Sequence, residues 1–138
     1  MAVVNFNFTR ILAERTSQLE GKINIRNNVS IKDVTRSELD FGSTKQPVLK
    51  FIFEFTSDYD PKVGHITLNG EVVYMENEKK VQDILKEWKK DKRISKDIMA
   101  NIINNVLAKC NIQALIISKD VNLPPPIPLP KLQPDQNI

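Results

Sequence analysis

Apolar and polar side chains alternate through the first half of the chain, a period of two that is typical of strands with one solvated face. The alternation is seen in Val3–Leu12, in Lys22–Ile31 and in the strongly aromatic Val48–Thr56. Between the last two segments, Glu38–Pro47 is polar and contains glycine and serine, so it is predicted to be a loop. A fourth apolar segment, Val63–Met75, begins at the end of the turn sequence SDYDPKVG. The pattern therefore predicts four strands.

The dipeptide Asn69-Gly70 lies inside the fourth of these segments. Asn-Gly between apolar residues is the strongest short-range signal for a hairpin. A turn at this point would leave Ile66–Leu68 as a stub, whereas an uninterrupted strand matches the length of Val48–Thr56. We therefore interpret Val63–Met75 as one strand, in which Gly70 needs a reason other than a turn.

From Asn77, a plausible N-cap, the apolar period lengthens to that of a helix. A second helix is predicted to begin at Ser95 and to extend to about Ser118, with Asn111 as an alternative end. The final segment, NLPPPIPLPKLQPDQNI, is too rich in proline for a helix and predicts an extended arm. Strands followed by helices indicate an α+β fold with both helices on one face of the sheet. The apolar positions of the two helices are Val81, Ile84, Leu85 and Trp88, and then Ile98, Met99, Ile102, Ile103, Val106, Leu107 and Cys110.

The second face of the central strands is also partly apolar. Val48 and Ile52 oppose the aromatic face of their strand, and Val73 and Met75 lie among the last residues of the fourth. Helices on one face would leave these side chains exposed, and such a patch usually marks a protein partner or an oligomer interface.

Length and charge set broad limits on the function. The chain has 138 residues, the size of one domain, and its 20 basic and 17 acidic residues give a net charge of +3. Lysines concentrate in the first predicted helix. This concentration supports an alternative hypothesis, in which the chain is a small basic protein associated with nucleic acid or the ribosome. The strip consists of Lys79, Lys80, Lys86, Lys89, Lys90, Lys92 and Arg93. Interleaved acids lower its potential, so nucleic acid is the weaker partner prediction; these acids are Glu78, Asp83, Glu87 and Asp91.

Little in the sequence is typical of an enzyme. Cys110 and His65 are the only residues of their types, and no phosphate-binding loop, dinucleotide motif or nucleophile motif is present. Asp58 and Asp60 would hold a cation weakly, although turns favour aspartate in any case. No signal peptide and no apolar run of about 18 residues is evident. We therefore expect a soluble, cytoplasmic protein that is not an enzyme and has no cofactor or metal.

Three short segments, together with the order of the elements, resemble the SecB export chaperone family and its SecB-like relatives. FNFTRILAER is similar to the first strand of that family, with its basic-apolar pair Arg10-Ile11. GHITLNGEVVYM is similar to the fourth strand, which passes straight through a glycine, and LPPPIPLPKL is similar to the Pro-rich closing segment. The resemblance extends from about Asn5 to Leu132 and implies one SecB-like domain over residues 1–132, with 133–138 as a disordered tail.

The resemblance implies a four-stranded antiparallel sheet, a short and a long helix, and a tetramer built as a dimer of dimers. Members of the family hold non-native polypeptides in apolar grooves without ATP, for export or for a dedicated client. Gly70 would then lie at a bulge or where another chain approaches. The implied peptide-binding residues are Phe51, Phe53, Phe55, Tyr74, Met75 and Trp88. The implied oligomer interface consists of Ile98, Ile102, Val106 and Gly70.

One property departs from the family. The bacterial exporters are acidic and dock on a translocation ATPase through an acidic surface of the sheet. This chain is net basic, and Glu54 and Glu71 are the acids evident in its last two predicted strands. Docking on that ATPase is therefore not carried over from the resemblance.

Overall fold

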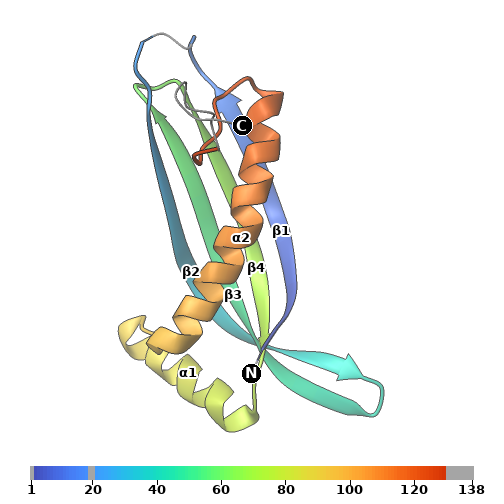
Figure 1. The fold of residues 1–138 in the computed structure, drawn as a ribbon. Coiled ribbons are helices and arrows are strands. Elements are labelled where there is room, and N and C mark those ends of the chain that lie inside the picture. Colours follow the sequence, from blue (N-terminus) through green and yellow to red (C-terminus); the bar gives the residue numbers. More distant parts are fainter. Residues whose placement is uncertain (1, 19–20, 130–138) are drawn as a thin grey trace, which may run out of the picture.

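The computed structural model describes residues 2–18 and 21–129, which form one antiparallel sheet and two helices (Figure 1). The strands pair in the order β1-β4-β3-β2, so β1 and β2 are the edges of the sheet. This arrangement confirms the predicted α+β fold with four antiparallel strands. The elements are β1 (Ala2–Arg15), β2 (Asn24–Phe41), β3 (Thr44–Asp60), β4 (Gly64–Met75), α1 (Glu78–Asp91) and α2 (Lys96–Asp120).

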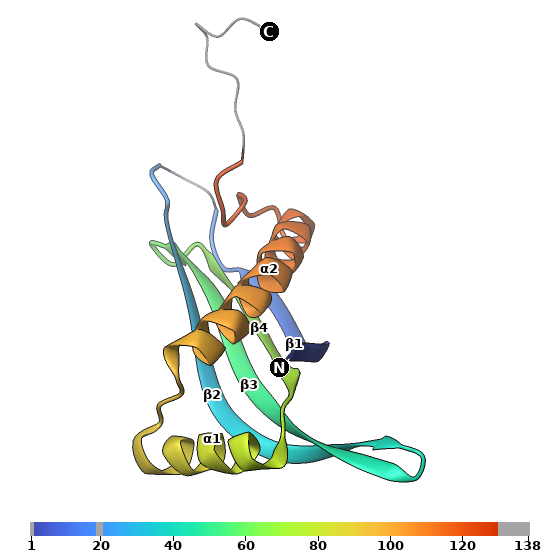
Figure 2. The same cartoon turned by 60° about the horizontal axis from the view of Figure 1, so that its bottom comes forward.

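Both helices lie on the same side of the sheet. The long helix α2 crosses the sheet obliquely (Figures 1 and 2). The short helix α1 lies at one end of the sheet, beside β2. The helix α1 packs on β2 and β3, whereas α2 packs on β1, β3 and β4. The side chains of the sheet that face these helices form the core.

The prediction of a loop over Glu38–Pro47 is wrong. The second strand continues to Phe41, which pairs with Thr44 across a two-residue turn, and Gly42 has a φ of +80° there. The long hairpin projects beyond the helices, as both views show (Figures 1 and 2). Both faces of this projecting part are solvated, so its strands do not need the apolar alternation of a half-buried strand. The prediction failed because it relied on that alternation.

The fourth strand is continuous, and the interpretation of Asn69-Gly70 as part of a strand is confirmed. Gly70 pairs with Phe8 on one side and with Phe53 on the other. A Cβ at this position would lie 2.7 Å from the Phe53 ring and against the backbone carbonyl of Asn7. The register of β1 shifts directly beside Gly70, between Phe8 and Arg10. The glycine is therefore explained by a bulge and a close approach within this chain.

Aromatic side chains fill the core between the sheet and α2. Phe51, Phe53 and Phe55 are completely buried. The Phe53 ring stacks on Phe6, 5.1 Å between ring centroids, and meets Phe8 edge to face at 6.2 Å. The helix contributes a single row of buried residues four positions apart, a narrower stripe than the sequence pattern predicted. That row is Ile102, Val106, Cys110, Ala114 and Ser118.

The helix ends agree closely with the prediction. The Asn77 side chain accepts a hydrogen bond of 2.9 Å from the Lys80 amide and so caps α1. Ser95 occupies the cap position of α2 without a side-chain cap bond, and α2 passes Asn111 and ends at Asp120.

Stability is expected to fall in alkaline solution, because burial raises the pKa of three groups. The pKa values of the Tyr59 phenol and the Cys110 thiol rise to about 12, and the pKa of Tyr74 rises as well. Each folded group holds its proton more tightly than the unfolded chain does. Its contribution is therefore complete below the unfolded pKa, 9.0 for the thiol and 10.0 for the phenols, and is lost as the pH rises toward 12.

The measurement is the midpoint of urea unfolding from neutral pH to about pH 11. The midpoint should be level to about pH 9 and then decline, and the decline should be shallower in Tyr59→Phe. A midpoint that stays level over the whole range would contradict the prediction.

Candidate functional site

The far face of the sheet, opposite the helices, does not present the predicted apolar patch. Val48 and Val73 are buried, at 0% and 3% exposure, and Ile52 is half-buried. On this face Lys50 of β3 lies opposite Val73, and Glu71 of β4 lies opposite Ile52. Lys50 and Glu71 form a diagonal ion pair across the two strands, with 3.9 Å between Nζ and Oε1. The long side chains cover apolar surface with their stems, so charge and not hydrophobicity dominates this face.

An open apolar groove lies instead on the helix side, at the edge of the sheet. It is formed where β2, the end of α1 and the start of α2 meet, and it has a volume of about 540 Å³. We call it the edge groove. Its lining is Val29, Ser30, Ile31, Lys32, Trp88, Lys92, Met99 and Ile103.

Local structure fixes the aromatic wall of the edge groove. Trp88 is only 6% exposed, and its indole Nε1 donates to the Asp33 carboxylate at 3.3 Å. Lys92 ends α1 in the left-handed conformation, φ +55°, and its amide bonds to the Trp88 carbonyl at 2.9 Å. That turn brings the Lys92 ammonium to 5.2 Å from the centroid of the Trp88 ring, within the range of a cation–π contact.

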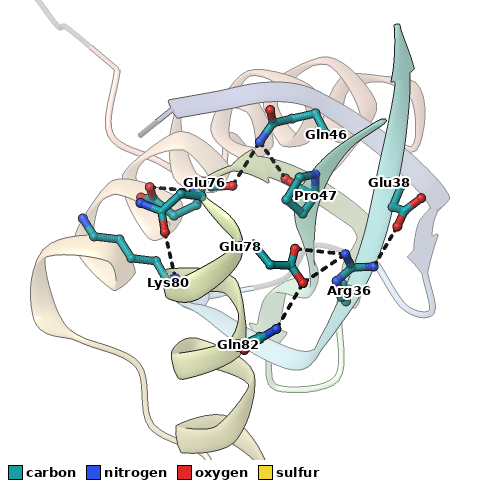
Figure 3. Close-up of polar contacts among 9 residues, drawn as sticks. Arg36, Glu38, Gln46, Pro47, Glu76, Glu78, Lys80 and Gln82 are labelled. Carbon is teal, nitrogen blue, oxygen red and sulfur yellow. Dashed lines mark hydrogen bonds and ion pairs between the residues drawn. The ribbon is translucent and has the colours of Figure 1, made fainter. Parts of the chain in front are cut away.

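A polar cluster at the other end of α1 holds this helix against the sheet (Figure 3). Arg36 of β2 donates to both carboxylate oxygens of Glu78, at 3.0 and 3.2 Å, and to Glu38 at 3.1 Å. Gln82, one turn along α1, donates to Glu78 at 3.3 Å. The Arg36 guanidinium lowers the pKa of the Glu78 carboxyl. The cluster fixes the start of α1 on β2 and thereby orients Trp88 at its far end.

The described part of the Pro-rich arm folds back on its own chain. The Tyr59 hydroxyl donates to the Pro124 carbonyl, and Asn27 Nδ2 donates to the Pro126 carbonyl at 2.8 Å. Arg15 Nε reaches the Val121 carbonyl at 3.0 Å. A second hollow of about 510 Å³ lies between Ile25, Asn27 and residues 124–129. The prediction of a disordered tail at residues 133–138 lies outside the described residues.

Of the six residues predicted to bind peptide, only Trp88 lines the edge groove. The sequence placed Phe51, Phe53 and Phe55 correctly on one face, but the two helices cover that face and leave them no accessible surface. Tyr74 belongs to the same core, at 5% exposure. Met75 points to the far face, because it pairs with Val48 and alternates with Tyr74.

The residues predicted for an oligomer interface have neighbours within the chain. Ile102 and Val106 are completely buried against the sheet, and Gly70 lies inside it. Ile98 is half-buried. The large apolar side chains of α2 that are well exposed are Ile112 and Ile116, at 60% and 54%. A role of the predicted set in assembly remains a prediction.

Polar and charged side chains gather around one hollow of about 480 Å³, which is lined by Thr16, Arg26, Asp58, Tyr59, Asp60, Lys62, Gly64 and His65. Cys110 is buried in the core, and His65 stands 3.8 Å from Glu14 on the far face. Within residues 2–18 and 21–129, no cluster of three metal-binding side chains is found. None of the described helices has the length and hydropathy needed to span a membrane.

Comparison with known proteins identifies the fold. No protein-family model matches the chain, and no curated protein matches its sequence. A solved structure of the SecB-like chaperone Rv1957 of Mycobacterium tuberculosis, in complex with a ChAD peptide from the Rv1956 HigA1 antitoxin, is similar with a TM-score of 0.52. The alignment covers 96% of this chain and 89% of that chain, at 10% sequence identity. The chain therefore has the SecB-like fold that its sequence motifs predicted.

Proposed function

We propose that the protein is an ATP-independent, chaperone-like protein that binds extended segments of non-native polypeptides in the edge groove. The observation that carries the proposal is an open apolar groove placed at a free edge of a SecB-like sheet. An unfolded client exposes apolar side chains, and transferring one of them from water to such a groove contributes about 1.5–3 kcal/mol. The antitoxin peptide bound in the similar mycobacterial structure supports polypeptide as the class of ligand.

The second hollow extends the same surface. Ile25 and Asn27 of β2 line it, while Val29 and Ile31 of β2 line the edge groove. These side chains alternate along one strand on its helix side, so the two hollows lie in series beside β2. An extended client would place its apolar side chains in both, which suits a binder that does not read a particular sequence.

We further propose that the protein acts as a homo-oligomer, a dimer or a tetramer. One groove gives modest affinity, and several grooves on one assembly raise it through effective concentration. Exposed apolar side chains on the edge strand β1, Val4 at 43% and Ile11 at 44%, and on α2, Ile112 and Ile116, supply surface for this assembly.

Polypeptide holding of this kind needs no catalysis and no cofactor, and it suits a cytoplasmic protein serving export or one dedicated client. Docking on a translocation ATPase through an acidic sheet is not part of the proposal. Glu54 and Glu71 of the far face lie 3.9 Å from Lys32 and Lys50 respectively, which offsets their charge.

The test is light scattering of the purified chain with and without a chemically unfolded client, in the absence of ATP. We expect an oligomer that forms a soluble complex with the client and suppresses its aggregation. A monomer that leaves the aggregation unchanged would refute the proposal. Steeply salt-dependent binding to nucleic acid instead would favour the alternative function of the basic helix α1.

A further inference from the structure

We propose that Lys92 and the basic residues around it make the edge groove selective for polypeptide segments that carry acidic residues beside the apolar side chain they insert. This inference rests on the proposed function and specifies the class of client. It would distinguish the protein from a binder that responds to hydrophobicity alone.

The geometry of β2 at the groove favours recognition through side chains. The register of β2 against β3 shifts between Ile31 and Asp33, so Lys32 is an extra residue at a bulge. A bulge that carries a lysine on an edge strand interrupts the pairing of a further strand at that point. A client would therefore contact the groove mainly through side chains, and the charges around the rim would influence which client is bound.

The floor of the groove is apolar and its rim is cationic. Val29, Ile31, Met99 and Ile103 supply aliphatic surface beside Trp88, and the two charged residues of the lining are both lysines. Asp33 is not part of the lining, and its carboxylate accepts hydrogen bonds from the Trp88 indole and the Val34 amide.

Lys92 is available to a ligand. In the described part of the chain, no acid lies within ion-pair distance of Lys92, whose ammonium stands over the Trp88 ring. The Lys32 ammonium lies instead 3.9 Å from Glu54 of the far face, so its charge is directed away from the groove. Lys92 is not held in a tight pair that a ligand carboxylate would have to break.

The end of α1, the start of α2 and the residues between them strengthen this potential. Residues 89–96, KKDKRISK, contain five basic residues and one acidic residue, and Lys92 is near their centre. A client that passes over the groove therefore meets an excess of positive charge on the helix side. Acidic residues on either side of its apolar anchor would be attracted, and basic residues would be repelled.

The test measures peptide binding by fluorescence anisotropy with the full-length chain. Three fluorescent peptides share one leucine–phenylalanine core and differ only in their flanks, which are aspartate, asparagine or lysine. Exposed ion pairs contribute modestly, so two or three of them should make the aspartate peptide bind about tenfold more tightly than the lysine peptide at low salt. The difference should shrink as salt is added, since exposed charges are screened.

Charge reversal assigns the effect to the rim. Lys92→Glu should reverse or abolish the preference and Lys92→Gln should reduce it, whereas Lys109→Glu, at an exposed position of α2 outside the groove, should leave it unchanged. Using two variants of Lys92 protects the test if one of them folds poorly. Equal binding of all three peptides would overturn this inference but leave the proposed function intact. Failure of every peptide to bind would overturn both.

Discussion

A valine in place of Gly70 is expected to remove most or all of the stability of the fold. The first added atom would lie 2.7 and 2.9 Å from two carbons of the Phe53 ring and against the Asn7 carbonyl, closer than side-chain carbons pack. Phe53 is completely buried and stacked on Phe6, so its ring has no free space to enter. Overpacking a core costs about 1–3 kcal/mol for small insertions and more when the backbone opposes it.

The total stability of a domain of this size is of the order of 5–15 kcal/mol, so an effect at the upper end would leave little folded protein. Chemical unfolding followed by circular dichroism measures the change. Gly70→Ala should already destabilise, because its single methyl group meets the same atoms.

Gly42→Ala is the matched control for this prediction. Gly42 has a φ of +80° in the turn of the β2–β3 hairpin, and a Cβ there would contact no other atom within 4 Å. The substitution Gly42→Ala should therefore lower the free energy of unfolding only through backbone strain, by about 1–2 kcal/mol. If Gly70→Ala were no more destabilising than Gly42→Ala, the bulge in β1 would have to relax, and the account of Gly70 as a packing requirement would fail.

Gly70 also illustrates how much of the fold was readable from the sequence. Alternation predicted the strands, and the length of the strand after SDYDPKVG decided correctly against a turn at Asn69-Gly70. The same reasoning failed at Glu38–Pro47, because a hairpin solvated on both faces carries no apolar alternation. Periodicity reports burial, and it identifies a strand only where one face of that strand is buried.

The candidate site was less predictable, because it depends on the order of the strands in space. Sequence alternation showed that Phe51, Phe53 and Phe55 share a face, but only the path of α2 shows that this face is closed. The edge groove uses Val29 and Ile31, which became accessible because β2 is an edge strand. Nothing in the segment Lys22–Ile31 distinguishes an edge strand from a central one. Trp88 was predicted because the resemblance to the SecB family implied it, at the end of the apolar stripe of the first helix.

Charges in the edge groove are expected to weaken client holding strongly while the fold remains intact. Ile103 is half-buried in the groove wall, at the position where α2 begins to cross the sheet. Ile103→Asp and Ile103→Lys both remove apolar surface and place an ion in a largely apolar lining. The lost burial of a client side chain, about 1.5–3 kcal/mol, corresponds to a loss of affinity of roughly tenfold to a hundredfold.

The two opposite charges separate hydrophobic binding from electrostatics. The measurement uses a peptide with neutral flanks, together with suppression of aggregation of an unfolded client. If apolar burial drives binding, aspartate and lysine at position 103 should impair it alike, although their effects on the rim potential are opposite. Because Ile103 is only half-buried, the unfolding midpoint should change modestly, by the equivalent of about 1–2 kcal/mol.

Phe41→Asp provides the control, since Phe41 is 58% exposed at the tip of the projecting hairpin, outside the lining of the groove. The same loss of exposed apolar surface at this position should leave client holding unchanged. Equal impairment by Phe41→Asp and Ile103→Asp would mean that any exposed apolar side chain serves, and the edge groove would not be the binding site. Selective loss at Ile103 would establish that holding depends on the groove at the junction of β2, α1 and α2.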